Sequence, residues 1–132
     1  EMASLLGTTT SGTSGAQICN TLNSLLSKTS DTRRFQRVTI STAALETSVR
    51  SSLRNDFPLT LNVKEMPNYT SGSGHFIAVK GYYFNTSTDF KTITICDPHP
   101  TYSGTYTYTL EEMETAVESS NGYYNRLDAS TV

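Results

Sequence analysis

The sequence predicts an α+β domain in which helices come first and a mostly antiparallel sheet follows. Two stretches in the first half repeat apolar residues at helical spacing, and residues 58–64 alternate apolar and polar side chains as a half-buried strand does. Two β-branched and aromatic runs, 76–84 and 92–96, are separated by the turn-forming residues 85–89, so we expect them to pair as an antiparallel hairpin. A chain of 132 residues supports one modest core, and a single domain over residues 1–132 is expected.

Three helices are expected before the sheet. A short run of helix formers at 2–6 ends at Gly7, and a longer helix covers about 15–26. The third begins after Ser41, whose hydroxyl can accept a hydrogen bond from the first turn, and runs to about residue 54. The apolar residues at helical spacing are Ile18, Leu22, Leu25, Leu26, Leu45, Val49 and Leu53.

The other segments predict loops, one late helix and short strands at 38–40, 105–109 and 123–124. The basic stretch 29–37 is interpreted as a solvated loop, with anion binding as the alternative. Residues 67–74 are rich in Asn, Ser and Gly and predict a loop in front of the hairpin. Thr109 and Glu112 have the spacing of a capping box, which predicts a helix start, and residues 125–132 are expected to be a frayed tail.

Composition excludes several classes of function. The net charge is −2, which does not favour binding to nucleic acid or to an anionic membrane. No apolar run approaches the roughly 20 residues of a membrane-spanning helix. Charged residues make up 17 % of the chain, below the usual quarter. Ser, Thr, Asn and Tyr take their place, a balance common in exported bacterial proteins, so a secreted or cell-surface location is expected.

The two cysteines do not predict a metal site. Cys19 and Cys96 lack the spacing of metal ligands, and no metal or other cofactor is expected. Both lie within apolar patterns, so each is expected to be a small buried residue and not half of a disulfide.

The central hairpin brings a histidine next to a carboxylate. If its turn centres on Thr86, partner numbers sum to about 172, and His75 lies across from Asp97 at the rim of the sheet. An imidazole held by a carboxylate is the base and the orienting acid of a nucleophilic triad. The same pair could also be a purely structural hydrogen bond. His99, two residues further on, either faces the same cleft or lies in an exposed loop.

The motifs around this pair resemble a known family. GHFIAVKGYYF, TITICDPHP and YTLEEM are similar to the C-terminal half of papain-like cysteine peptidases, in particular the bacterial family related to bacteriocin-processing, double-glycine leader peptidases. The resemblance covers most of the chain and implies a papain-like fold. It also implies that His75 is the catalytic base, that Asp97 is its orienting acid, that the substrate is a peptide or protein, and that no cofactor takes part.

The resemblance further implies a nucleophilic cysteine at the N-terminus of the central helix, where the helix dipole and the imidazolium lower the pKa of the thiol. Residues 2–6 resemble the end of that helix, so this cysteine is expected upstream of Glu1. Two alternatives stay open. In one, Cys19 is the nucleophile. In the other, the domain is a catalytically inactive binding module in which tyrosines such as Tyr69 and Tyr102 supply contact area.

Overall fold

A computed structural model of the chain describes residues 2–9 and 13–128, and it confirms the α+β architecture. The helices are α1 (Met2–Leu6), α2 (Gly15–Leu26), α3 (Thr42–Arg54) and α4 (Leu110–Glu118). The strands are β1 (Arg34–Thr39), β2 (Leu59–Met66), β3 (Tyr69–Asn85), β4 (Phe90–Asp97), β5 (Gly104–Thr109) and β6 (Tyr123–Asp128).

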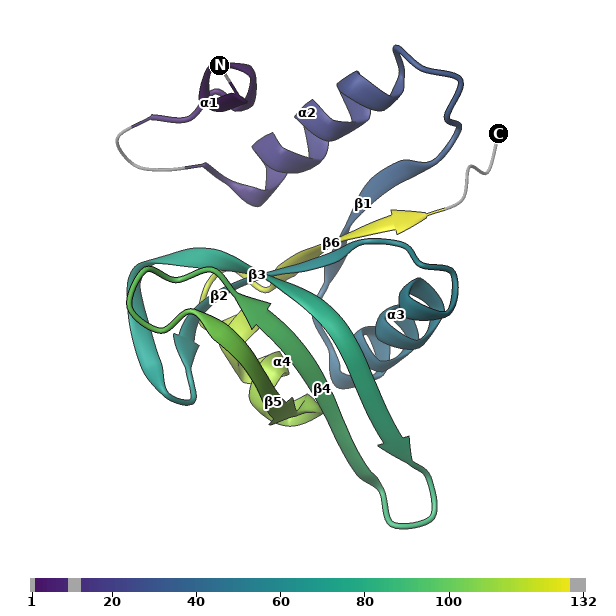
Figure 1. Cartoon of the computed structure of the whole chain (residues 1–132), viewed down its shortest axis with the longest axis vertical. Helices are drawn as coiled ribbons and strands as arrows, with labels where there is room; N and C mark the ends of the chain where they lie inside the picture. The colour runs from purple at the N-terminus through teal and green to yellow at the C-terminus, as the bar shows by residue number, and fades with distance from the viewer. Residues whose placement is uncertain (1, 10–12, 129–132) are drawn as a thin grey trace.

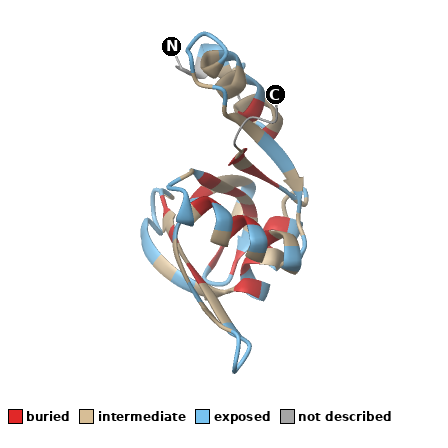
Figure 2. Cartoon of the chain, turned by 90° about the vertical axis from the view of Figure 1, so that its right-hand side faces the viewer, coloured by how far each residue is buried: buried red, intermediate tan, exposed pale blue. Residues whose placement is uncertain are grey.

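The strands form one sheet in the order β1-β6-β2-β3-β4-β5, and every neighbouring pair is antiparallel (Figure 1). Helices α3 and α4 pack against one face of this sheet, α2 lies along β1, and α1 packs on α2. The buried residues gather between the sheet and the pair α3 and α4, whereas α2 buries only Gly15 and Cys19 (Figure 2). The core therefore supports the face of the sheet on which the candidate site lies.

Each of the three longer helices begins at a hydroxyl cap. Ser41 accepts a hydrogen bond from the first turn of α3, as predicted. Thr109 and Glu112 form the predicted capping box of α4. A second capping box, Ser14 with Gln17, starts α2. Its Ser-x-x-Gln spacing is also visible in the sequence.

Two strands, β1 and β6, are longer than the short strands predicted at 38–40 and 123–124. The prediction of a loop over 29–37 is wrong in its second half, because β1 begins at Arg34. The prediction of a frayed tail is wrong as far as Asp128, while 129–132 lie outside the described residues. Strand β6 inserts between β1 and β2, and the Tyr124 hydroxyl donates to the main chain of α3. Pairing between segments that are distant in the sequence can form a strand even where the local residues do not favour one. The local pattern therefore did not predict the full length of β1 and β6.

The prediction of a loop over 67–74 is also wrong, because β3 begins at Tyr69 and the turn between β2 and β3 contains only two residues. The ladder is interrupted after Thr70, where residues 71–74 face a single residue of β2, and pairing resumes at His75. The Ser/Gly-rich stretch is therefore a large bulge inside a strand. It leads directly into the candidate site.

The hairpin of β3 and β4 is paired in a register different from the predicted one. Asn85 pairs with Phe90, so partner numbers beside the turn sum to 175 instead of about 172. The turn is centred between residues 87 and 88, and not on Thr86. Asp89 completes it in the left-handed conformation, with φ of 57°. Residues 85–89 all favour turns, so the sequence did not show that Asn85 would belong to the strand and pair with Phe90.

A β-bulge in β3, between Val79 and Gly81, decides which face Asp97 occupies. Without the extra residue, the register at the turn would put Asp97 opposite Ala78, on the face away from α3 and α4. The bulge shifts the register by one residue, so Asp97 and His75 share the face that these helices cover.

Candidate active site

His75, Asp97 and Tyr69 form a hydrogen-bonded triangle where β3 begins and β4 ends. His75 Nε2 lies 3.0 Å from Asp97 Oδ1 and 2.6 Å from the Tyr69 hydroxyl. The Tyr69 hydroxyl donates to Asp97 Oδ2. The structure thus brings together the two residues that the sequence singled out, and it adds a third that the sequence did not indicate as part of the site.

Asp97 is the buried acid of this triangle, with 4 % of its surface exposed. Burial alone raises the pKa of a carboxyl group, but hydrogen bonds from Tyr69, from the main-chain N–H of His99 and from His75 outweigh it. The pKa of Asp97 therefore lies below its ordinary value, and the side chain is a carboxylate at neutral pH.

Tyr69 is held in place as a neutral phenol. Burial, the hydrogen bond to Asp97 and the charge of that carboxylate all raise the pKa of Tyr69 well above its ordinary value. Its ring stacks on Tyr102, with centroids 4.4 Å apart and planes 8° from parallel, and the His99 ring lies 4.7 Å away. Tyr69 is thus buried in the site and offers little surface to a binding partner.

The second nitrogen of His75 is the atom that the triangle leaves unused. His75 Nδ1 is buried and has no hydrogen-bond partner among the described residues. His99, the other histidine, lies close by but uses its own Nδ1 to accept the main-chain N–H groups of Thr101 and Tyr102. His99 therefore orders the loop after β4, whereas His75 has one nitrogen held by the carboxylate and one available.

Gly74 fixes the backbone that enters His75. Its φ is 87°, a conformation that side chains disfavour. A Cβ atom at Gly74 would also lie 3.1 Å from the main-chain oxygen of Val63. The Gly-His motif thus has a structural basis, because glycine closes the bulge at the point where the imidazole must be aimed.

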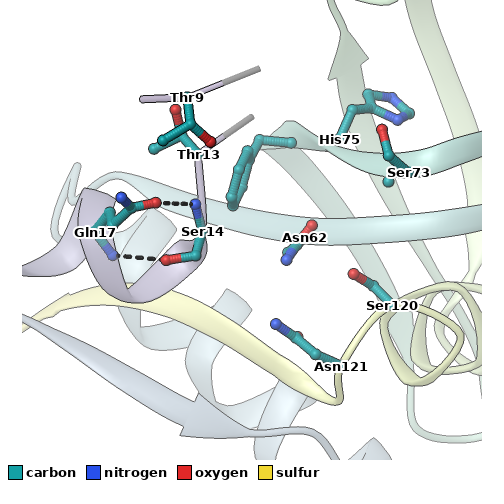
Figure 3. Close-up of a pocket in the computed structure, with 11 residues that line it drawn as sticks. Thr9, Thr13, Ser14, Gln17, Asn62, Ser73, His75, Ser120 and Asn121 are labelled. Carbon is teal, nitrogen blue, oxygen red and sulfur yellow. Dashed lines mark hydrogen bonds between the residues drawn. The ribbon is translucent and has the colours of Figure 1, made fainter. Parts of the chain in front are cut away.

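A polar pocket of about 390 Å³ lies beside His75 (Figure 3). Except for His75, the described residues that line it are uncharged, and amide or hydroxyl side chains from α2, β2, the bulge of β3 and the end of α4 face the same space. Gln17 is already engaged, since its side chain closes the capping box with Ser14. Among the described residues, the side chains of Asn62 and Ser120 have no hydrogen-bond partner, so they are available to a ligand.

Neither cysteine of the sequence forms part of the triangle. Cys19 donates to the main-chain oxygen of Phe35 at 3.4 Å, and burial raises the pKa of its thiol although Arg37 opposes that change. A nucleophilic cysteine needs the opposite change in pKa. Cys96 pairs with Ala78, on the face of the sheet away from His75. Both cysteines are free, as the sequence predicted, but only Cys19 is buried, so the prediction of burial is wrong for Cys96, which is partly exposed.

Residues 2–9 and 13–128 contain neither a cluster of metal ligands nor a helix suited to span a membrane. No three His, Cys, Asp or Glu side chains of this part of the chain are grouped as metal ligands. None of its helices has the length and hydropathy needed to cross a membrane.

The fold and the site define an α+β domain in which a partly buried histidine and a buried aspartate lie beside a polar pocket. The model of the Peptidase_C39 like family matches residues 1–131. The chain therefore belongs to this family, and the relationship to papain-like cysteine peptidases that its motifs suggested is confirmed. Among curated proteins and solved structures, none matches the chain.

Proposed function

We propose that this domain hydrolyses peptide bonds through a Cys-His-Asp triad in which His75 is the base and Asp97 orients it. The observation that carries the proposal is the orientation of the His75 ring, with Nε2 on Asp97 and a buried Nδ1 that lacks a partner among the described residues. A buried polar atom without a partner costs about 1–3 kcal/mol, so a donor beside Nδ1 is expected. For a member of this family, a thiol is the donor that fits.

The chemistry assigned to these groups is acyl transfer. His75 Nδ1 takes the proton of the thiol, and the thiolate attacks the carbonyl carbon of the peptide bond. The imidazolium then gives this proton to the departing amine. Water next attacks the thioester, again with His75 as base, and releases the acid and the free thiol. Asp97 holds the ring and stabilises the imidazolium in each half of the cycle.

The thiol in this proposal belongs to a residue that precedes Glu1. Cys19 is hydrogen-bonded to the edge strand β1, and its raised pKa disfavours the thiolate. Cys96 lies on the far face of the sheet, so it does not approach His75 from the side of the triangle.

The pocket beside His75 supports a substrate preference. Its Asn62 amide and Ser120 hydroxyl, which have no partner among the described residues, can both donate and accept hydrogen bonds, and apart from His75 its described lining offers no charge to an acidic or basic side chain. The proposed substrate therefore places an uncharged polar residue, such as Ser, Thr, Asn or Gln, next to the bond that is cleaved.

The test is hydrolysis of fluorescently labelled casein by a chain that includes its natural residues before Glu1. His75→Ala is expected to lower kcat by about 10²–10⁴-fold, the contribution of a general base. The matched control is His99→Ala, which removes the only other histidine. This variant is expected to cost far less, because the His99 ring packs against the Tyr69 and His75 rings but hydrogen-bonds only to loop main chain and not to the carboxylate. Equal losses in the two variants, or no hydrolysis by the parent, contradict the proposal.

One observation favours a second candidate, a peptidase-fold binding module without activity. The sequence contains two cysteines, and neither lies in the triangle. Such a module binds peptides in the pocket and leaves them intact even when the preceding residues are present. Saturable peptide binding that Asn62→Leu abolishes, without any cleavage product, would establish this candidate instead.

A further inference from the structure

The Tyr69 hydroxyl is a single atom that contacts both members of the His–Asp pair. It lies 2.6 Å from His75 Nε2 and donates to Asp97 Oδ2. The other carboxylate oxygen, Oδ1, lies 3.0 Å from the same nitrogen and also accepts the main-chain N–H of His99 at 2.9 Å. The carboxylate is thus held at both oxygens, and the imidazole faces two oxygen atoms at once.

The proton positions follow from counting donors and acceptors. A phenol has one proton, and here it goes to Asp97, whose carboxylate can only accept. The Tyr69 oxygen then presents a lone pair to His75 Nε2, and Asp97 Oδ1 presents another. Two lone pairs that face one nitrogen require that this nitrogen carries the proton. Nε2 is therefore the N–H of the ring, and Nδ1 is left as the basic nitrogen.

We propose that Tyr69 is a positioning residue, which orients the Asp97 carboxylate and shares the Nε2–H proton of His75, so that Nδ1 remains the proton acceptor. The consequence for catalysis rests on the function proposed above. The arrangement of protons does not, and it can be measured on the chain as it stands.

The surroundings of Tyr69 fit a positioning role. The two-residue turn between β2 and β3 and the bulge at 71–74 bring it next to His75, although six positions separate them. The stacked ring of Tyr102 restricts its movement, and burial keeps its hydroxyl away from bulk water. Its raised pKa means that the phenol retains the proton that the argument requires.

The first experiment needs no variant. A long-range ¹H–¹⁵N spectrum of the chain near pH 8 distinguishes a protonated from an unprotonated ring nitrogen in each histidine. We expect His75 to carry its proton on Nε2, with a protected Nε2–H resonance, and Tyr69 to remain a phenol when ordinary tyrosines ionise. A His75 ring protonated on Nδ1, or a Tyr69 that ionises with the exposed tyrosines, overturns the proposal.

The second experiment compares Tyr69→Phe with Tyr102→Phe, which removes a hydroxyl from the stacked ring that does not contact the pair. Loss of the Tyr69 hydroxyl is expected to raise the pKa of Asp97, measured by ¹³C carboxyl NMR, and to speed solvent exchange of the His75 Nε2–H, because one donor and one acceptor are lost. Tyr102→Phe is expected to leave both unchanged. If both variants behave like the parent, Tyr69 has no positioning role.

Activity then separates this inference from the function on which it rests. In the chain that includes the residues before Glu1, Tyr69→Phe is expected to lower kcat by up to about 10²-fold with little change in KM, the pattern of a misplaced base. If the NMR results hold but no chain hydrolyses peptides, the proposed function fails and the positioning role stands. If hydrolysis depends on His75 and Tyr69→Phe retains full kcat, the positioning role fails and the function stands.

Discussion

Removal of the Asp97 carboxylate deprives three buried or partly buried donors of their acceptor: the Tyr69 hydroxyl, His75 Nε2–H and the main-chain N–H of His99. A hydrogen bond to a charged group contributes about 1.5–3 kcal/mol, and the three are not additive because they share one carboxylate. For Asp97→Ala we therefore expect a loss of about 3–5 kcal/mol in the free energy of unfolding, the range for one partner lost from a buried ionic network.

Asp97→Asn is the matched variant, since it retains the shape and one acceptor oxygen. The asparagine oxygen can still accept from His75 and His99, while its NH₂ group faces the Tyr69 hydroxyl, so the expected loss is about 1–2 kcal/mol. Urea unfolding followed by circular dichroism measures both variants against the parent, and equal m-values would show that the same transition is compared. An Asp97→Ala variant within about 1 kcal/mol of the parent would refute the reasoning, because the triangle would then not be a buried network.

Three other predictions concern Gly74, the effect of acid and Cys19. Gly74→Ala is expected to lower the free energy of unfolding by about 1–3 kcal/mol, because its φ is 87° and Val63 O is close; urea unfolding measures this, and an unchanged midpoint would be inconsistent with the backbone described. Acid should remove the contribution of Asp97: its folded-state pKa is lowered, so this contribution is complete above about pH 4 and is lost as the pH falls further. Urea midpoints should therefore drop below pH 4 in the parent and less steeply in Asp97→Asn, and parallel curves would argue against this assignment. Cys19→Ser should weaken packing against β1 but leave peptide hydrolysis by the longer chain intact, and loss of activity without unfolding would make Cys19 the nucleophile.

Much of the fold was predictable because it is encoded locally. The helix that ends at Arg54, the capping box of Thr109 with Glu112, and the alternation of residues 58–64 all appear in the structure where short-range patterns placed them. Only the end of β1 near Val38 and the start of β6 at Tyr123 and Tyr124 were predicted as short strands. The rest of each strand was missed because it is defined by pairing with the other strand, about 90 positions away in the chain.

The contact between His75 and Asp97 was predicted, although the register of β3 with β4 was not. Beyond the bulge in β3, partner numbers sum to 174, so the true register differs from the predicted one by two residues. A shift by an even number of residues keeps both side chains on the same face of the sheet. Their contact therefore survived an error in the position of the turn. Tyr69 could not be found in the same way, because a two-residue turn and the bulge at 71–74, both interpreted as one loop, determine its distance from His75.

The central claim is that His75 and Asp97 are the acid–base half of a thiol peptidase. Its most direct test is the pH dependence of iodoacetamide alkylation in the chain that includes the residues before Glu1. The account predicts one cysteine, distinct from Cys19 and Cys96, that reacts rapidly below pH 7, well under the ordinary thiol pKa of about 8.5, and loses this reactivity in His75→Ala. If no such cysteine reacts below pH 7, or if its rate is the same without the His75 imidazole, the central claim is contradicted.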